Sequence, residues 1–367
     1  SCPGIADPAS RYYFAEGTTR PGFEEWILVF NPGDGPARLR ARFFSSQGAE
    51  EKDFELLPRS RLSISVHGAV PWQEDVSAIL ESSAPVAAER ALYFSRGGGF
   101  GGMTLAAGTS EPSTRHYFSE GAVRPGFEAY IAVFNPSAST AASVAVGIYG
   151  SGGMEGEPAV AVPPLGRSTL LLNDLVGEGD HAVVLRSAAP VVAERSEYFA
   201  YNGSITGAHC SAGAHGPGSE WIFAEGTTRG QSDGYLALFN PCDYRTWLKV
   251  RLVCSDGVKR EEMLELGAGE RKTVFINPML PPDVDYSIHV FSLLPVLVER
   301  TSYYQTYNAL GGYCTPGTTA PRERWIFAEG CTAQGYREWL ALFNSGLDEQ
   351  VVEVEYVPGS GEKVSRS

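Results

Sequence analysis

Carboxylates and guanidinium groups recur at a fixed spacing and are the residues best placed to do chemistry. A glutamate in the motif Phe-(Ala/Ser)-Glu-Gly occurs four times, at Glu16, Glu120, Glu225 and Glu329. A Glu-Arg pair occurs three times, at Glu89-Arg90, Glu194-Arg195 and Glu299-Arg300. Repeated carboxylates could form equivalent weak ligand sites whose binding adds up by avidity. Residues present in every copy must first serve the shared fold, however, so we expect the glutamates and the Glu-Arg arginines to be buried structural partners.

Four aspartates occur in single copies and are candidates for a site that the repeats do not share. They are Asp174, Asp180, Asp233 and Asp283. If loops brought such residues together, they could supply the two carboxylates, about 5 to 10 Å apart, that a glycosidase needs. The sequence contains no Gly-x-Ser-x-Gly, P-loop or His-Glu-x-x-His motif, and these motifs mark common nucleophile, phosphate and zinc sites. We therefore predict no catalytic residue, cofactor or metal site, and an enzyme is the less favoured class.

Composition and charge argue against several kinds of partner. The chain has 367 residues and a formal net charge of -14. Nucleic-acid phosphates are bound by clustered Lys and Arg, so this acidic balance argues against a nucleic-acid partner. No run of 18 apolar residues occurs, so no membrane span is predicted. The chain begins Ser1-Cys2-Pro3, without Met or an apolar leader, as expected of a processed mature protein or of an excised piece.

The six cysteines do not define a disulfide framework. Cys2, Cys210 and Cys314 fall near one repeat position. Cys242 and Cys254 would lie at opposite ends of one hairpin, more than about 20 Å apart, beyond a disulfide's reach of about 7 Å. We therefore expect Cys242 to lie near Cys210 or Cys314 of a neighbouring copy, and the connectivity stays open.

The copies are about 104 residues long, and the whole chain, 1–367, is predicted to be one repeat domain. The copies span 11–114, 115–218, 219–322 and 323–367, and the last one stops before its Glu-Arg pair. Each full copy contains two groups of about four strand signals separated by turn residues. A four-stranded module of about 50 residues is the size of a propeller blade, and the chain would hold about seven of them. The predicted fold is all-β, a seven-bladed β-propeller built from about 3.5 double-blade repeats.

The alternative is a row of tandem immunoglobulin-like β-sandwiches, one for each copy. In a propeller the last module, 325–367, would pack its apolar strand 339–343 against the first module. Residues 1–10 would help to close the ring, and the protein would be a monomer. In a row of sandwiches the last copy would expose an apolar face, and the chain would assemble through open strand edges.

The second strand of each copy is apolar on both faces and is preceded by a variable loop. Each of these strands contains one large aromatic residue near its start, namely Trp26, Tyr130, Tyr235 and Trp339. Because half-exposed strands alternate apolar and polar residues, we expect these rings to pack in the core rather than to stack on sugars. The loops differ between copies, so any ligand site is expected on the face that carries them. They are 17–25, 121–129, 226–234 and 330–338.

Three elements together give the chain a family resemblance over nearly its whole length. They are Phe-Ala-Glu-Gly-Thr-Thr-Arg at 14–20 and 223–229, the aromatic–aliphatic strand that ends in Asn-Pro, and Pro-Val-Val-Ala-Glu-Arg at 190–195. In these elements the chain resembles the secreted "WYFAEG" repeat proteins of Gram-positive actinobacteria. The resemblance implies export, an extracellular or cell-envelope location, and repeats. It implies no activity that could be carried onto named residues.

The expected function is a non-enzymatic binding or adhesion module outside the cell or on its surface, with glycan or surface protein as the partner and no cofactor. One alternative is a structural subunit of a surface array or filament made of immunoglobulin-like domains. A second alternative is a secreted glycan-active hydrolase on a propeller scaffold, whose site would lie in loops that the copies do not share.

Overall fold

The structure is nearly all β, as predicted. The computed structural model describes the chain except for residues 1, 98–99, 306–308, 334, 358–363 and 367. Its large sheets are antiparallel. Within the described residues, helix is confined to three short segments, α1 (Val66–Ala69), η1 (Leu172–Asp174) and η2 (Asn277–Met279). No helix of this part of the chain is long and apolar enough to cross a membrane.

The first unit (9–107) is one curled sheet built around a long strand. Its strands are β1 (Ala9–Phe14), β2 (Phe23–Asn31), β3 (Ala37–Ser45), β4 (Gly48–Leu56), β5 (Ser60–Ser65), β6 (Ser77–Ser95) and β7 (Gly101–Ala107). The first half of β6 pairs with β1 and β3, and its second half pairs with β2 and β7. β4 lies beside β3, and β5 lies beside β2. The two halves enclose one apolar core that includes Phe14, Ile27 and Phe43.

Units 2 (113–212) and 3 (218–316) repeat this arrangement. Unit 2 contains β8 (Ser113–Phe118), β9 (Ala122–Val123), β10 (Phe127–Phe134), β11 (Ala142–Gly150), β12 (Gly153–Gly156), β13 (Ala159–Val162), β14 (Arg167–Leu171), β15 (Gly179–Asp180), β16 (Ala182–Tyr201) and β17 (Ile205–Ala212). Unit 3 contains β18 (Gly218–Phe223), β19 (Gln231–Phe239), β20 (Thr246–Cys254), β21 (Lys259–Leu266), β22 (Arg271–Phe275), β23 (Tyr286–Gln305) and β24 (Leu310–Pro316). The long strands β16 and β23 take the place of β6.

A proline marks the point where each long strand passes from one half of its unit to the other. In β6 the pairing with β3 ends at Ser82, and the pairing with β2 begins at Ala87. Pro85 lies between them, and Pro190 and Pro295 hold the equivalent places in β16 and β23. A proline has no N–H to give to a ladder, so it is tolerated where one ladder has ended and the next has not begun.

A seven-bladed propeller is not confirmed. The strands of a blade are neighbours in the order of the sequence, whereas the order in unit 1 is β4-β3-β6-β2-β5. The predicted grouping into four consecutive strands does not hold, because β6 pairs with strands from both groups. Each complete copy is instead one curled antiparallel sheet around its own apolar core.

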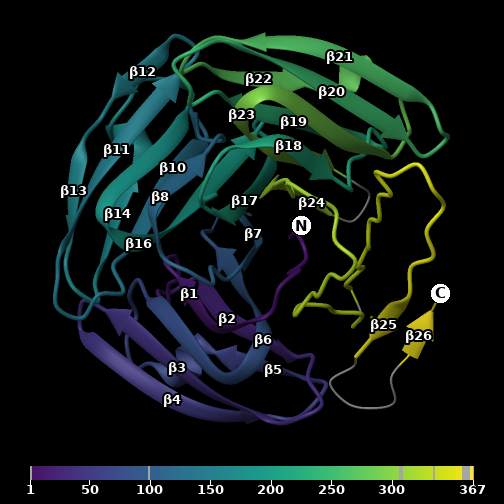
Figure 1. The fold of residues 1–367 in the computed structure, drawn as a ribbon. Helices are drawn as coiled ribbons and strands as arrows, with labels where there is room; N and C mark the ends of the chain where they lie inside the picture. Colours follow the sequence, from purple (N-terminus) through teal and green to yellow (C-terminus); the bar gives the residue numbers. More distant parts are fainter. Residues whose placement is uncertain (1, 98–99, 306–308, 334, 358–363, 367) are drawn as a thin grey trace.

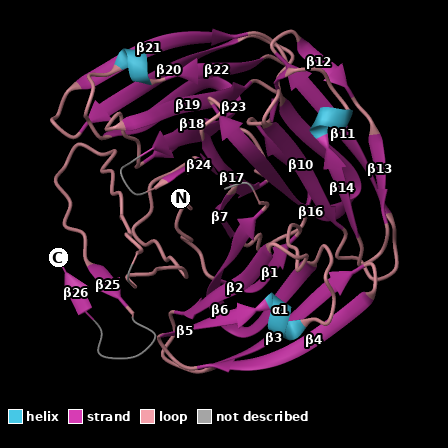
Figure 2. Cartoon of the chain, turned by 180° about the vertical axis from the view of Figure 1, so that it is seen from behind, coloured by secondary structure: helices cyan, strands magenta, loops and turns pink. Residues whose placement is uncertain are grey.

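The units are nevertheless arranged around a common centre. Figure 1 shows units 1, 2 and 3 following one another around the molecule, with β7, β17 and β24 toward the middle. β17 packs against both β7 and β24. The described residues of the fourth copy, including β25 (Val354–Tyr356) and β26 (Val364–Arg366), lie on the remaining side (Figures 1 and 2).

The beginning of the chain pairs with its fourth copy. Ile5 and Ile326 exchange two backbone hydrogen bonds of 2.8 and 2.9 Å, so the first residues take the closing position that was expected of them. The predicted packing of 339–343 against unit 1 is not found. Trp339 is 85% exposed, and between Pro316 and Val354 the described residues form no named strand.

The cysteines are all free thiols. The sulfur of Cys242 lies 3.7 Å from the backbone oxygen of Pro295 in its own unit. Cys210 and Cys314 are buried. The expected approach of Cys242 to one of them is therefore not found, because Cys242 lies at a surface turn after β19.

Candidate functional site at the junctions between units

The repeated glutamate and the repeated Glu-Arg pair meet where two units touch. The carboxylate of Glu16, after β1, pairs with Arg167 at the start of β14 in unit 2 at 2.9 Å. Glu194 of unit 2 accepts a hydrogen bond from the N–H of Ala15 (2.8 Å) and pairs with Arg90 of unit 1 (2.7 Å). Arg90 also donates to the backbone carbonyl of Glu16. These charged side chains are nearly fully buried, so this contact is an ionic lock between units 1 and 2.

The junction between units 2 and 3 repeats the lock. Glu299 of unit 3 accepts hydrogen bonds from the N–H groups of Ser119 (2.7 Å) and Glu120 (2.8 Å). The same carboxylate pairs with Arg195 of unit 2 at 2.9 Å, and Arg195 donates to the carbonyl of Glu120 at 2.7 Å. Arg271, at the start of β22, pairs with the carboxylate of Glu120 at 2.9 Å.

The partners in the lock differ from those expected. At these two junctions the carboxylate of the first-strand glutamate pairs with an arginine of the next unit. The arginine of the Glu-Arg pair instead donates a hydrogen bond to the backbone carbonyl of that glutamate. The expected direct pair occurs in unit 3, where Arg300 lies 2.5 Å from Glu225. The arginines that sequence reasoning missed share one register position, opposite the last aromatic residue of the second strand. They are Arg61, Arg167 and Arg271, opposite Phe30, Phe134 and Phe239.

Burial and charge set the ionisation of the lock. Burial lowers the pKa of Arg195, but the Glu299 carboxylate outweighs this effect, so the pKa lies well above its ordinary value. The same balance raises the pKa of Arg90, with Glu194 as the largest opposing charge. Arg90 and Arg195 therefore stay charged, and the carboxylates that they bind, Glu194 and Glu299, hold the units together.

The four unshared aspartates do not form a cluster. Asp180 pairs with Arg124 and, at 3.0 Å, with Arg271 beside the lock. Asp233 accepts a hydrogen bond of 2.6 Å from the Tyr201 hydroxyl. Asp174, at the end of η1, and Asp283, before β23, are exposed.

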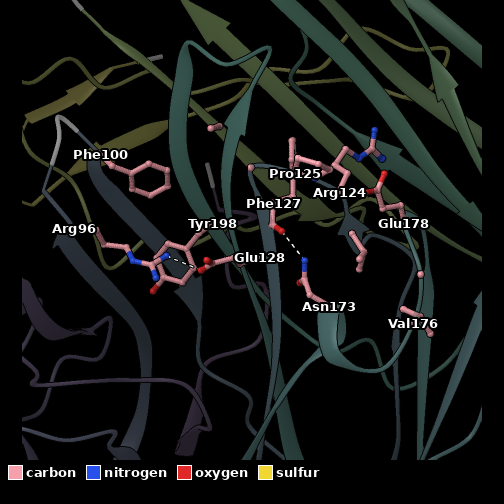
Figure 3. Close-up of a pocket in the computed structure, with 14 residues that line it drawn as sticks. Arg96, Phe100, Arg124, Pro125, Phe127, Glu128, Asn173, Val176, Glu178 and Tyr198 are labelled. Carbon is pink, nitrogen blue, oxygen red and sulfur yellow. Dashed lines mark hydrogen bonds and ion pairs between the residues drawn. The ribbon is translucent and has the colours of Figure 1, made fainter.

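A cavity of about 810 Å³ opens at the junction of units 1 and 2. One wall is formed by Arg96, whose guanidinium lies 4.7 Å from the centre of the Tyr198 ring and 6.0 Å from that of Phe100. Glu128 of β10 pairs with Arg96 at 2.8 Å and accepts a hydrogen bond of 3.2 Å from the Tyr130 hydroxyl. Figure 3 shows this group of side chains at one end of the cavity. Two aromatic rings, a carboxylate and a guanidinium therefore meet in one open site.

The other wall comes from the variable loop 121–129 and the segment after η1. Asn173 holds the loop by donating to the carbonyl of Phe127 (2.8 Å) and accepting from the N–H of Ala129 (3.2 Å). Arg124 and Glu178 also line this wall (Figure 3). The cavity thus lies on the face where the sequence places its variable loops.

The junction of units 2 and 3 has a site at the equivalent sequence positions, but with different side chains. Tyr201, Asp233, Tyr235 and Tyr303 stand where the first junction has Arg96, Glu128, Tyr130 and Tyr198. The rings of Tyr201 and Tyr303 are stacked, with centroids 4.1 Å apart. The Tyr201 hydroxyl bonds to Asp233 (2.6 Å) and Tyr235 (2.7 Å). A tyrosine therefore replaces the arginine of the first site.

The junction of the fourth copy and unit 1 has a third version. Glu24 accepts a hydrogen bond of 2.9 Å from the indole N–H of Trp26. Tyr93, at the position of Tyr198, lies beside Tyr336 of the fourth copy, and burial, with Tyr336 as the next cause, raises the pKa of Tyr93 to about 12. A carboxylate and aromatic rings thus recur at three junctions.

The expectation that the aromatic residues of the second strand pack in the core is met only in part: Trp26 and Tyr235 pack against buried apolar clusters, whereas Trp339 is 85% exposed. Trp26, Tyr130 and Tyr235 are half-buried. Two residues before each ring lies a carboxylate; sequence reasoning named Asp233 but missed Glu24 and Glu128 at the equivalent position. The available signal was that this position is acidic in all three complete copies.

Comparisons with known proteins give no family. No protein-family model and no curated protein matches the chain. Among solved structures, Thermotoga maritima 1070 is 21% identical over 28% of this chain and 94% of that chain, with a TM-score of 0.26. The Anabaena sensory rhodopsin transducer is 21% identical over 23% of this chain and 87% of that chain, with a TM-score of 0.21. An anti-sigma factor domain-containing protein covers 85% of this chain and 84% of its own at 9% identity, with a TM-score of 0.16.

Proposed function

We propose that the chain is a non-enzymatic binding module, outside the cell or on its surface, that binds glycans at the junctions between its units. The observation that carries the proposal is the open site of Arg96, Phe100, Glu128 and Tyr198. The location rests on the resemblance of the repeat motifs to those of secreted proteins.

The chemistry of this site suits a carbohydrate. Sugars present apolar C–H faces, which pack on aromatic rings, and vicinal hydroxyl groups, which bond to charged planar groups. Half-buried rings such as Tyr198 and Phe100 offer the first kind of contact, and the Arg96–Glu128 pair offers donors and acceptors side by side. A concave site with apolar walls and a few convergent polar groups is the usual form of a small-molecule site.

Recurrence of the site supports multivalent binding. Three junctions carry a carboxylate and aromatic rings on related positions, at Glu128, Asp233 and Glu24. Individually weak sites on one rigid body bind a polymeric glycan cooperatively, because the second contact is made at high effective concentration. The differences between the junctions would let them take different parts of one glycan.

A glycan-active hydrolase is the second candidate, favoured by one observation. Glu128 and Glu178 line the same cavity, and glycoside hydrolysis needs two carboxylates across one site. Release of reducing sugar by the chain, lost in Glu178→Gln, would select this function, whereas binding without product would exclude it.

A glycan-array screen followed by titration of the best oligosaccharide tests the proposal. Tyr198→Ala is expected to weaken binding by up to about tenfold, since a stacked aromatic contact contributes about 0.5–1.5 kcal/mol. Glu128→Gln tests the polar contact. Tyr244→Ala is the matched control, because Tyr244 is an exposed tyrosine outside the cavity. Absence of glycan binding, or an equal loss in the control, would overturn the proposal.

A further inference from the structure

The start of the chain holds, in the fourth copy, the position that follows the last strand of a complete unit. In each complete unit, one residue of the first strand exchanges two backbone hydrogen bonds with a residue just after the last strand. These pairs are Tyr13–Thr109, Tyr117–Ala214 and Ile222–Thr318. The fourth copy makes the same exchange between Ile326 and Ile5. The residue that follows the last strand therefore has its equivalent, for the fourth copy, at the other end of the chain.

A glycine contact supports this equivalence independently. A Cβ atom at the glycine after each last strand would meet the first-strand phenylalanine ring at under 3.0 Å, so the backbone and the ring are in close contact. The distances are 2.7 Å for Gly108 and Phe14, 2.8 Å for Gly213 and Phe118, and 2.8 Å for Gly317 and Phe223. Gly4 stands in the same relation to Phe327, at 2.9 Å.

The fourth copy also uses the ionic lock, with unit 1 as its acceptor. Glu89 of unit 1 accepts a hydrogen bond of 2.7 Å from the N–H of Glu329. Arg61 pairs with the Glu329 carboxylate and donates to the carbonyl of Ala328 at 2.6 Å. Glu329 thus docks on unit 1 as Glu16 docks on unit 2 and as Glu120 docks on unit 3. The fourth copy therefore contacts unit 1, unit 1 contacts unit 2, and unit 2 contacts unit 3, so that the four copies follow one another around a ring.

One lock remains open, at the edge of unit 3. Glu225 is the one repeated glutamate not yet accounted for. Its carboxylate contacts Arg300 and Tyr313 of its own unit. Arg300 is buried, and among the described residues its Nε and Nη1 atoms have no hydrogen-bond partner. In units 1 and 2 the equivalent Nη1 atoms bind the glutamate of the next unit, Glu194 and Glu299. Unit 3 therefore presents a buried cation that lacks this carboxylate.

No named strand of the described residues covers 339–343, the second-strand segment of the fourth copy. In unit 1, β2 lies between β5 and β6, and Ile27 and Val29 are fully buried. Leu340 and Leu342 hold the equivalent positions and are 42% and 56% exposed. Exposed apolar side chains in a row mark a binding surface.

We propose that the gap between unit 3 and the fourth copy is a docking site for a polypeptide with the residue pattern of the middle of a unit. That pattern is a short strand that begins with arginine, followed by a long strand that contains Glu-Arg. Its arginine would form an ion pair with the Glu225 carboxylate, and its glutamate would form one with Arg300. Its strands would flank 339–343 and bury Trp339, Leu340 and Leu342.

Continuity with the three closed locks and charge complementarity define this partner. A second, unaltered copy of the chain does not fit, because its three middle segments already hold Glu16, Glu120 and Glu329. The inference concerns a protein partner and does not depend on the glycan proposal.

The test is an extended chain in which a copy of residues 264–305 follows Ser367. Ser367 and Met263 hold equivalent positions, since Glu329 and Glu225 are also 104 residues apart (367 − 263 = 104 and 329 − 225 = 104). The appended segment therefore keeps the register of the repeat. The matched control carries Arg271→Gln and Glu299→Gln in the appended copy alone, which removes the lock but keeps length and hydrophobicity.

Hydrogen exchange of 339–343 and thermal unfolding are the measurements. The extension is expected to slow exchange on the order of tenfold or more relative to the chain itself, and to raise the melting temperature by about 2 °C or more. The control is expected to lose most of both effects. Adding Glu225→Gln to the host should remove most of the difference between extension and control. Equal protection in extension and control, or none in either, would overturn the proposal.

A second experiment tests the proposal if the extended chain fails to fold. Residues 264–305 fused to a soluble carrier protein are titrated into the unmodified chain, with tryptophan fluorescence and calorimetry as readouts. Saturable binding by the intact segment, lost with Arg271→Gln and Glu299→Gln, supports the docking site. No binding, or equal binding by both segments, rejects it.

Discussion

The guanidinium of Arg195 in unit 2 lies 2.9 Å from the carboxylate of Glu299 in unit 3, and both side chains are buried at the boundary between the units. This one pair joins two copies that are 104 residues apart in the sequence. It also explains why a glutamate and an arginine recur together, because units 1 and 2 each use the arginine toward one neighbour and the glutamate toward the other.

Arg195→Ala is expected to destabilise the protein strongly. The change leaves the Glu299 carboxylate buried with one cation removed, and breaking a buried pair costs about 3–5 kcal/mol. Chemical denaturation measures the loss. The double variant Arg195→Met with Glu299→Gln should recover part of it, since the uncompensated charge is then removed as well.

Arg11→Ala is the matched control for this prediction. Arg11 pairs with Glu81 on the surface and its side chain is 54% exposed, and exposed pairs contribute about 0–1 kcal/mol. An equal loss of stability in both variants, or none in Arg195→Ala, would show that burial of the lock is not what matters.

The contribution of Glu25 and Glu197 to stability is expected to fall as the pH rises from about 4.5 to about 8. Burial raises the pKa of Glu197 from 4.5 to about 8, and that of Glu25 to about 8. Both groups bind their proton more tightly when folded. Their stabilisation is therefore complete below the unfolded pKa and is lost as the pH rises through the folded one.

Glu197→Gln should reduce this pH dependence. Glu197 accepts a hydrogen bond of 3.0 Å from the N–H of Ala122, and its other oxygen lies 3.6 Å from Nε2 of buried His209. A glutamine keeps both contacts and has no proton to lose. Unfolding free energies at several pH values should show a slope lower by at most about 1.4 kcal/mol per pH unit. An unchanged slope would contradict the raised pKa.

A separate effect is expected at the acid end. Burial lowers the pKa of His116 from 6.5 to about 4, so its contribution is present above the unfolded pKa and is lost as the pH falls toward 4. His116→Gln should therefore flatten the stability profile between about pH 6.5 and 4. A variant profile parallel to that of the parent would argue against a neutral buried imidazole.

Glycine at the close contacts should not tolerate a methyl group. A Cβ at Gly108 would lie 2.7 Å from the Phe14 ring, so Gly108→Ala must displace the ring and is expected to cost about 1–3 kcal/mol. Gly35→Ala is the control, since its Cβ would meet nothing within 4 Å. Thermal melting distinguishes the two, and equal melting temperatures would contradict the close packing.

The junction sites should act together on an extended glycan. Tyr198→Ala alters the first junction and Asp233→Ala the second, and the two lie in different copies. On an immobilised polymeric glycan the double variant should lose much more affinity than either single variant, because avidity multiplies the sites. On a short oligosaccharide that fills one site, the double variant should match the weaker single variant. Equal behaviour on both ligands would indicate a single site.

Much of the fold followed from local sequence features. Repetition at about 104 residues predicted equivalent units, and the turn residues and alternating strands predicted an all-β chain. The grouping of strands could not be predicted, because the partners of β6 come from both ends of the unit. Pro85 was a signal for the division of that strand, and it becomes interpretable only when both ladders are known.

The candidate site was harder to predict than the fold. Glu16 and Glu120 were the most regular carboxylates, and they proved to lie inside the ionic locks. Glu128 was one acidic residue among the 43 of the chain. It became a candidate because Arg96 and Tyr198 meet it across the boundary between two units.

The sequence by itself determined that the copies are alike, because the same residues recur at the same spacing and equal sequences fold equally. Only the tertiary structure decided which of these residues face a neighbouring copy and which face solvent. Arg90 and Glu194 are joined across 104 residues, and Ile5 and Ile326 are joined from nearly opposite ends of the chain. Contacts of this kind depend on how the units close around a common centre, and no local periodicity carries that information.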